Sequence, residues 1–395
     1  MKVLLVHNSY QQRGGEDVVF EQETDLLRRH GHRVVLYMRS NREIEKYSGV
    51  RRLGLLKQTI WADDAYAQVA ELIRRERPDL VHVHNTFVMI SQSIYSACRE
   101  AGVPVVQTLH NYRLFCPEGN FLRAGGVCEE CLDKTLACGI LHGCYRGSRI
   151  STAAVTVMLA YHRNRHTLEA ISSFIALSQF ARNKFVQAGL PANKMVVKPN
   201  FVYPDPGIRR SAGEYVLYAG RLSAEKGVDV LLEAWKQVKE PIRLQIIGDG
   251  PLNARVSAFR EQDPRISFLG RLPRTEVLAA MKGARLLVLP STCYENFPMT
   301  IVEAYACGLP VIASDLGAIP ELVEAQRNGL LFRRGDTREL ADSIAWAWKH
   351  PEDLVRMGKE CRADYELKYT AESNYESLKR IYESLTPSEP PCYAN

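Results

Sequence analysis

The chain has 395 residues, of which 46% are hydrophobic and 24% charged, and its formal net charge is +6. This composition is typical of a globular protein, the length suffices for two domains with separate cores, and no apolar stretch approaches the roughly 20 residues of a membrane-spanning helix. The first residues, MKVLLVHNSY, pass directly from an apolar strand to a polar loop, so we predict no secretory signal and a cytosolic protein.

The first half of the chain alternates short apolar runs with helical patterns, as doubly wound parallel sheets do. The predicted strands are Val3–Val6, Val34–Tyr37, Leu80–Val83, Val105–Leu109 and Phe174–Leu177. The predicted helices are Glu16–Arg29, Ala62–Arg77 and Gln92–Gly102. This order of elements predicts an α/β, Rossmann-like domain over residues 1–202.

A second series of strands follows a proline-rich break. The segment 198–207 ends in Pro-Asp-Pro-Gly and has no clear periodicity, so we place the domain boundary there. The later strands are Tyr215–Ala219, Leu244–Ile247, Ile266–Leu269, Leu286–Leu289 and Val311–Ala313. We therefore predict a second Rossmann-like domain over 203–370 and a C-terminal helix with a tail over 371–395, and we predict that residues 366–385 are helical.

Positive charge is concentrated in the first half of the chain. Residues 1–200 hold 26 Lys+Arg against 18 Asp+Glu, whereas residues 201–395 hold 25 against 27. The basic residues closest together are Arg28, Arg29, Arg33, Arg39, Arg42, Lys46, Arg51, Arg52 and Lys57. A solvated surface and contact with an anionic membrane or lipid-diphosphate acceptor both explain this run. Nucleic acid is not predicted, because the chain has no aromatic-interleaved basic motif, zinc finger or helix-turn-helix pattern.

The segment 290–313 gives the strongest chemical signal. Asn296 is a residue type that caps helices and Pro298 suits a first helical turn, so we predict that a helix begins there. The N-terminus of a helix presents free N–H groups to a phosphate. Glu295 and Glu303 lie around this start, where they could accept hydrogen bonds from different hydroxyl groups of one ligand. The segment therefore predicts a site for a sugar joined to a phosphate.

Two cations follow the first strand of the second series. Arg221 and Lys226 lie in the predicted turn after Tyr215–Ala219, where they would stabilise charge that develops on a leaving diphosphate. The alternative for Lys226 is a surface ion pair with Glu225 or a neighbour.

Two glycine motifs allow a close approach to the backbone. Gly14 and Gly15 precede an acidic helix and form either a plain loop or a place where a ligand comes close to the backbone. Gly248 and Gly250 begin like a dinucleotide fingerprint, but Asn253 occupies the third glycine position and no acidic residue follows at the end of a second strand. A dinucleotide site is therefore not predicted.

Together these motifs resemble the donor site of retaining GT-B glycosyltransferases of family 4. Glu295 and Glu303 stand eight residues apart in E-N-F-P-x-x-x-x-E-A-x-A-x-G-x-P-V-I-A. The other matching residues, in the order that the family uses, are Gly14, Gly15, His110, Gly220, Arg221, Lys226, Gly248 and Gly250. The resemblance implies two doubly wound domains facing a central cleft, with a C-terminal helix over 375–385 that crosses back to the first domain.

The resemblance also implies the reaction. A sugar would pass, with retention of anomeric configuration, from a UDP- or GDP-sugar to a lipid-linked or other glycan hydroxyl in cell-surface polysaccharide synthesis, without a catalytic divalent metal. The implied catalytic residues are His110, Arg221, Lys226 and Glu295. The implied donor-binding residues are Gly14, Gly15, Gly220, Gly248, Gly250, Asn296, Phe297, Pro298, Thr300 and Glu303. The Gly248–Pro251 turn would lie against the nucleobase.

Alternatives to this reading remain open. His110 would hydrogen-bond the sugar through its ring or backbone carbonyl, and a purely structural histidine is the alternative. A nucleotide-sugar epimerase of the same fold would bind the same donor. A non-catalytic sugar-binding protein is the third possibility, although the intact set of cations and carboxylates speaks against it.

Five of the ten cysteines fall between Cys116 and Cys144. In a cytosolic protein such a cluster argues for a metal before disulfides. The set Cys116, Cys128, Cys131 and Cys144 resembles a four-cysteine zinc ribbon with a structural, tetrahedral site. Cys138 is a spare cysteine, His142 competes for one position, and reduced thiols are the alternative. The family pattern lacks this insert, residues 113–147, so the nature of the acceptor stays open.

Overall fold

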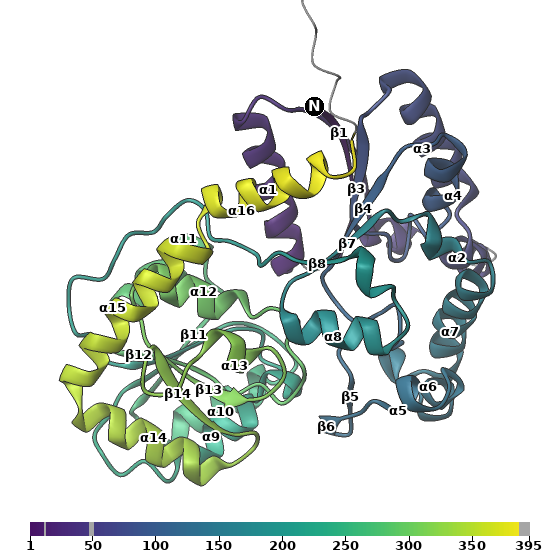
Figure 1. Cartoon of the computed structure of the whole chain (residues 1–395). Helices are drawn as coiled ribbons and strands as arrows, with labels where there is room; N and C mark the ends of the chain where they lie inside the picture. The colour runs from purple at the N-terminus through teal and green to yellow at the C-terminus, as the bar shows by residue number, and fades with distance from the viewer. Residues whose placement is uncertain (12, 47–50, 387–395) are drawn as a thin grey trace, which may run out of the picture. The chain divides into compact units, whose positions relative to one another are not determined.

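The structure, a computed structural model, describes residues 1–11, 13–46 and 51–386 of the chain, which form two compact units (Figure 1). The first unit contains residues 1–119, 129–198 and the described residues from 374 onward, and the second contains 120–128 and 199–373. The chain changes unit after Lys198 and after Ser373, a few residues away from the predicted limits at 202 and 370.

The first unit is built on a six-stranded sheet in which all neighbouring strands are parallel. In spatial order its strands are β2 (Arg33–Ser40), β1 (Lys2–Ser9), β3 (Leu80–Asn85), β4 (Val105–Leu109), β7 (Ser173–Ala176) and β8 (Met195–Val197). The chain moves outward from β1 to β2 and then returns to β3 on the other side of β1. Such a reversal leaves a crevice at the carboxyl ends of the strands, where α/β proteins bind ligands.

Helices cover the sheet of the first unit. They are α1 (Gly15–Arg29), α2 (Arg51–Ile60), α3 (Asp63–Glu76), α4 (Ile94–Glu100), α5 (Glu130–Asp133), α6 (Ala137–His142), α7 (Arg149–Asn164), α8 (Gln179–Gln187) and α16 (Ala371–Glu383). The last of these lies across α1 in Figure 1, where the ring of Tyr375 stacks on His30 with centroids 3.5 Å apart. The end of the described chain therefore completes the first unit.

The second unit repeats this plan with a different strand order. Its parallel strands are β11 (Ile266–Gly270), β10 (Leu244–Ile247), β9 (Val216–Ala219), β12 (Leu286–Leu289), β13 (Val311–Asp315) and β14 (Gly329–Arg333). Its helices are α9 (Val228–Trp235), α10 (Asn253–Gln262), α11 (Arg274–Gly283), α12 (Met299–Ala306), α13 (Ile319–Leu322), α14 (Thr337–Lys349) and α15 (Pro351–Lys368). The order reverses between β9 and β12, so the crevice of this sheet lies beyond these two strands.

Alternation along β9 shows how this sheet is buried on both faces. Val216 and Tyr218 pack in a core with α9, α10 and α14, whereas Leu217 and Ala219 pack in a second core with α11, α12 and α15. All four residues are at most 5% exposed. Burial on both faces explains why the strands read as continuous apolar runs.

One part of the predicted insert departs from the rest. The hairpin of β5 (Leu122–Arg123) and β6 (Gly126–Val127) belongs to the second unit, whereas α5 and α6 belong to the first. Phe121 is 1% exposed and meets the ring of Tyr294 edge-on, with centroids 6.2 Å apart. This buried aromatic contact explains why residues 120–128 belong to the second unit, although we predicted the whole insert as part of the first domain.

The stretch 366–385, predicted to be helical, contains the end of α15 and the whole of α16, with a break at Tyr369 and Thr370. The carbonyl of Tyr369 accepts a hydrogen bond from the backbone N–H of Val202 at 3.1 Å, which a continuing helix would instead use internally. In the part of the chain that the structure describes, no helix is both long and apolar enough to cross a bilayer.

Candidate functional site

A lysine–glutamate pair lies at the crevice of the second sheet. Lys226 ends the loop after β9, and Glu295 lies in the loop after β12. The Nζ atom of Lys226 lies 2.7 and 2.9 Å from the two carboxylate oxygens of Glu295, and the hydroxyl of Ser291 donates to Oε1 at 2.6 Å. Lys226 thus pairs with Glu295 and not with Glu225, the alternative considered above; Glu225 accepts from Ser223 Oγ at 2.5 Å.

The surroundings of this pair keep the charge of Lys226. Burial alone would lower the pKa of its ammonium group, but the negative charge of Glu295 outweighs that effect and the pKa is raised. The side chain of Lys226 is still 30% exposed, against 10% for Glu295. An incoming anion can therefore reach the ammonium, and the carboxylate would then be free to accept from a hydroxyl group.

The helix start after Glu295 differs from the prediction. Helix α12 begins at Met299, Pro298 is its N-cap, and no side chain caps it. Asn296 is 8% exposed and lies before this start, so its predicted role as the cap is wrong. The dihedral angles of Pro298, φ −77° and ψ 93°, are extended, which explains why the chain turns helical only after the proline. Phe297 and Thr300 are half-buried on either side.

Glu303 occupies the second turn of α12, as predicted, but it has an ion-pair partner. Its Oε1 lies 2.9 Å from Nε of Arg274, whose Nη1 donates to the carbonyl of Tyr203 at 3.0 Å. Burial raises the pKa of the Glu303 carboxyl, and the Arg274 charge opposes that shift without cancelling it. A ligand hydroxyl would thus meet a carboxylate already held in place by an arginine.

Two of the predicted site glycines are required by packing. Gly248 has φ +151°, and a Cβ there would come 1.8 Å from the carbonyl oxygen of Gly220. A Cβ on Gly250 would come 2.4 Å from the carbonyl oxygen of Leu222. The loops after β9 and β10 therefore touch through their backbones, which places the exposed Arg221 on this same surface.

Gly14 shows the opposite behaviour. Its φ of −116° is open to any residue, and a Cβ would meet nothing closer than Oδ2 of Asp17 at 4.0 Å. Its neighbour Gly15 is exposed at the first position of α1. The fold itself therefore does not require a glycine at position 14, which leaves room for a close approach by a ligand.

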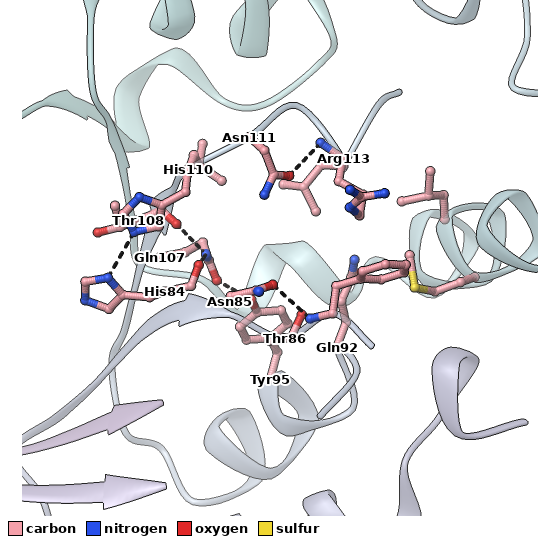
Figure 2. A pocket seen from close by; sticks show the side chains of 15 residues that line it. His84, Asn85, Thr86, Gln92, Tyr95, Gln107, Thr108, His110, Asn111 and Arg113 are labelled. Carbon is pink, nitrogen blue, oxygen red and sulfur yellow. Dashed lines mark hydrogen bonds between the residues drawn. The ribbon is translucent and has the colours of Figure 1, made fainter. Parts of the chain in front are cut away.

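The first unit contains a cavity of about 50 Å³ at the carboxyl ends of β3 and β4 (Figure 2). Its polar lining comes from His84, Asn85, Thr86, Gln92, Tyr95, Gln107, Thr108, His110, Asn111 and the cation Arg113. The apolar lining comes from Met158 and Leu159 of α7 together with Phe87, Leu109 and Leu114. The amide of Gln107 donates to the carbonyls of His84 and Thr108 at 3.2 and 2.7 Å, which fixes the wall between the two strands.

His110 lines this cavity and is linked to a second histidine. Its Nε2 lies 3.0 Å from Nδ1 of His84, as the dashed line in Figure 2 shows. Burial, followed by the proximity of His84 and His7, lowers the pKa of His110 well below its usual range. The ring of His110 is therefore neutral at physiological pH, and it can hydrogen-bond a hydroxyl without carrying charge.

Behind His84 lies a charged group that we did not predict. Glu23, on α1, is 0% exposed, and its Oε1 lies 2.5 Å from Nζ of Lys198, which is 1% exposed. The signal in the sequence was LVHVHN, which places His82 and His84 at alternate positions of a buried strand. Alternation puts both rings on one face, where buried imidazoles need polar partners.

The described residues contain one group of three or more metal-ligating side chains with ligand atoms within 4.8 Å of one another, namely Glu23, His82 and His84. This group includes none of the predicted zinc ligands. Cys116 is buried, whereas Cys128, Cys131 and Cys144 are half-buried. His142, the competing ligand, lies with Nε2 3.4 Å from Glu130. The cysteine site stays a prediction.

Part of the predicted basic surface is neutralised by ion pairs. Arg39 contacts Glu43 and Asp64, each at 2.8 Å, and only 14% of its side chain is exposed. Lys57 lies 2.7 Å from Asp63. The side chains of Lys46, Arg51 and Arg52 lie outside what the structure describes.

Comparison with known proteins identifies the family of each half of the chain. Residues 13–205 match the family "Glycosyltransferase Family 4", and residues 213–350 match "Glycosyl transferases group 1". WcaL of Escherichia coli strain K12, a glycosyltransferase assigned to colanic acid biosynthesis, is 25% identical over 85% of this chain and 88% of its own. The amylovoran biosynthesis glycosyltransferase AmsK of Erwinia amylovora is 28% identical over 53% of this chain. The match covers 56% of AmsK, so this chain spans little more than half the length of that relative.

Among solved structures, HepE of Anabaena, crystallised with UDP, is similar in fold. The superposition has a TM-score of 0.67 with 21% identity and covers 98% of this chain and 100% of HepE. The two parallel-sheet units are therefore those of the GT-B fold. Because its first half matches family 4 and its second half matches group 1, the chain belongs to the family 4, group 1 glycosyltransferases.

Proposed function

We propose that this protein transfers a sugar from a nucleotide-diphosphate donor to a hydroxyl group of a glycan or lipid-linked acceptor, with retention of anomeric configuration. The observation that carries the proposal is the Lys226–Glu295 pair at the crevice of the second sheet. The ammonium group of Lys226 is partly exposed there and can bind a diphosphate. The carboxylate of Glu295, released from its ion pair, can then accept a hydrogen bond from a sugar hydroxyl.

In this proposal the cations act on the leaving group. Charge grows on the diphosphate as the bond to the sugar breaks, and fixed positive charges close to that oxygen lower the barrier. Lys226 holds one such charge, and Arg221, exposed at the start of the same loop, supplies the second. Glu303, held by Arg274, would accept from another hydroxyl of the donor. No divalent metal is needed in this scheme.

The identity of the ligands is supported by the relatives. HepE has been solved with UDP and with UDP-glucose, which favours a uridine nucleotide as the donor. WcaL and AmsK are named for the synthesis of two polysaccharides, which favours a glycan acceptor and a role in cell-surface polysaccharide synthesis. The polar cavity of the first unit, which Arg113 also lines, would bind hydroxyl groups of that acceptor or of the transferred sugar.

Ligand-induced stabilisation tests the donor. Unfolding is followed with UDP-glucose, UDP-galactose, GDP-mannose and ADP-glucose, since a ligand at about 100 times its Kd stabilises by about 2.7 kcal/mol. We expect one nucleotide class to raise the unfolding temperature of the wild type but not of Lys226→Met. Lys236→Met is the matched control, because Lys236 pairs with Glu233 on the exposed side of α9. If the nucleotide raised the unfolding temperature of Lys226→Met and Lys236→Met equally, Lys226 would not belong to the donor site.

Kinetics tests the roles within the site. Glu295→Gln and Lys226→Ala should each lower turnover at least roughly tenfold, and Lys226→Ala should weaken nucleotide binding more, because Glu295 acts on the sugar in the transition state. The anomeric configuration of the product, read by NMR, tests retention. Wild-type rates in both variants would contradict the assignment.

A further inference from the structure

Four side chains of the first unit form a continuous line from the protein interior to the cavity. Lys198 Nζ donates to Glu23 Oε1 at 2.5 Å, and Glu23 Oε2 lies 3.1 Å from His84 Nε2, a close electrostatic contact that is not a well-aligned hydrogen bond. His84 Nδ1 then lies 3.0 Å from His110 Nε2, at the cavity wall. We call this set the histidine relay. Its members come from α1, from β3 and from the segments after β4 and β8.

The charges at the inner end of the relay are fixed. Burial alone would raise the pKa of Glu23, but the adjacent ammonium of Lys198 and the contact with His84 hold it well below its usual range. Burial lowers the pKa of His84 as well. At neutral pH Glu23 is therefore a carboxylate and both imidazoles are uncharged.

A metal ion is a poor alternative occupant of this place. The group Glu23, His82 and His84 has suitable ligand atoms, but the carboxylate already contacts an ammonium group. Both nitrogens of His82 are engaged as well, by the hydroxyls of Tyr382 and Thr108, each at 2.7 Å. A divalent cation would therefore have to sit beside Lys198 and displace existing hydrogen bonds. Lys198 supplies the positive charge that a metal would bring.

The positions of the protons follow from the donors and acceptors. An ionised carboxylate attracts the positive end of an N–H bond and can only accept, so the proton of neutral His84 belongs on Nε2, the nitrogen that lies 3.1 Å from Glu23 Oε2. His84 Nδ1 is then an acceptor, and the nitrogen opposite it, His110 Nε2, must carry the proton of His110. The Nδ1 atom of His110 is left with a lone pair. Among the described residues it has no protein partner.

We propose that Glu23 and Lys198 are positioning residues which, through His84, hold the proton of His110 on Nε2 and leave Nδ1 as a fixed acceptor for a ligand hydroxyl. This proposal rests on the proposed function, in which His110 contacts the sugar or its acceptor. An isolated neutral histidine exchanges between two tautomers, and a hydroxyl group can adapt to either. A single fixed tautomer makes the hydroxyl donate in one direction, which orients the ligand before reaction.

The substitution Glu23→Gln reverses the relay with little change in shape. Lys198 would hold the amide oxygen where Oε1 now lies, so the amide NH₂ group would face His84 Nε2. That nitrogen must then accept, His84 carries its proton on Nδ1, and His110 Nε2 becomes an acceptor. The proton of His110 moves to Nδ1, where it repels the hydrogen of a donating hydroxyl.

The test combines histidine ¹⁵N NMR with kinetics of the full chain. In the wild type we expect His110, assigned by comparison with His110→Gln, to show a protonated Nε2 and a bare Nδ1. In Glu23→Gln the pattern should exchange, and turnover with the nucleotide sugar should fall roughly tenfold, the effect of losing one hydrogen bond in a buried site. The control is Tyr382→Phe, which removes a hydroxyl from His82 but lies outside the relay. It should change neither the pattern nor turnover.

The outcomes separate this proposal from the donor-site assignment. A protonated Nδ1 on His110 in the wild type overturns the relay, and this measurement needs no variant to fold. An exchanged tautomer in Glu23→Gln with unchanged turnover overturns its role in positioning. Another outcome is loss of turnover in Lys226→Ala while the wild type shows the expected His110 tautomer and Glu23→Gln has no effect. That result would support the donor-site assignment and overturn the positioning role of Glu23. If Tyr382→Phe lowered turnover as much as Glu23→Gln does, the loss of turnover would come from destabilisation of the fold, and the proposal would be overturned.

Discussion

Each unit has a lysine–glutamate pair at its candidate site, and the two pairs have nearly equal lengths in very different surroundings. Lys198 and Glu23 lie 2.5 Å apart in the first unit with both side chains 1% exposed. Lys226 and Glu295 lie 2.7 Å apart in the second unit with 30% and 10% exposed. The first pair is closed to any ligand, whereas the second has an ammonium that solvent reaches. Similar ion pairs can therefore serve different purposes. The buried pair can fix neighbouring groups, and the partly exposed pair is accessible to a ligand.

The largest expected difference between the two pairs is in stability. Lys198→Met leaves a buried carboxylate without its partner, which costs about 3–5 kcal/mol of unfolding free energy. Lys226→Met should cost about 1 kcal/mol or less, because its pair is partly hydrated. Chemical denaturation at pH 7 measures both. Equal losses would mean that burial does not distinguish the pairs.

The pH dependence of the same variant sharpens this test. The pKa of Glu23 is depressed in the folded chain, so its stabilising contribution is present above its unfolded value and is lost as pH falls through the folded value. In Lys198→Met the main source of that depression is absent. The difference between wild type and variant should therefore shrink as pH falls, because the unpaired Glu23 of the variant takes up a proton while the wild-type carboxylate keeps its contribution until below about pH 4. A difference independent of pH would mean that packing, not charge, accounts for the loss.

Glu16 provides a third case, an acidic side chain without a fixed lysine. Burial and the nearby Asp17 raise its pKa to about 8, although Asn111 Nδ2 lies 3.5 Å from its Oε2. The folded chain then holds a proton that the unfolded chain releases, so stability falls as pH rises from about 4.5 to about 8. Glu16→Gln should be more stable than wild type at pH 8, by a margin that vanishes near pH 4. Parallel pH curves would show that Glu16 is ionised throughout.

The differences between prediction and structure have physical causes. Strands β4, β10 and β12 match their predicted limits, because strands buried on both faces are uninterrupted apolar runs. Strands β8 and β14 were missed. Both lie at a sheet edge and have only three consecutive apolar residues, and two of the three residues of β8 are exposed. Edge strands of this kind are hard to recognise from sequence alone.

The site was predicted unevenly for a similar reason. Lys226, Glu295 and Glu303 lie in short motifs that sequence displays directly. The partner of Glu23 lies 175 residues away, so no local pattern announces the pair. Even for Glu303 the motif indicated the residue but not its partner, Arg274. Motifs identify groups that meet a ligand, whereas the groups that hold them in place depend on the fold.

A smaller, local effect is expected from the cysteines, which we propose hold one zinc ion. Protein made in zinc-replete medium should contain about one zinc per chain. Cys131→Ser should lose the metal, whereas Cys138→Ser, the spare cysteine, should keep it. Chelation should raise amide hydrogen exchange between Cys116 and Cys144 and leave the Lys226 region unchanged. Metal analysis that finds no zinc would replace this proposal with four reduced thiols.

The smallest effect concerns attraction to a membrane, which we propose for the basic run of the first unit. The protein should sediment with anionic vesicles at 0.1 M salt and dissociate at 1 M, where the Debye length falls from about 10 Å to about 3 Å. Arg51→Glu with Arg52→Glu should weaken binding. Lys57→Glu should weaken it less, because Asp63 already neutralises that charge. Equal sedimentation with neutral vesicles would favour a soluble acceptor.

Helix α16 has a consequence for the order in which the protein is made. Residues from 374 onward complete the first unit, where Tyr375 covers His30 and Tyr382 bonds His82. The ribosome delivers them only after the intervening residues 199–373. At about 5–20 residues per second that delay is roughly 10–35 s. The second unit can therefore finish folding on the ribosome while the first, begun earlier, still has an open face that exposes His82.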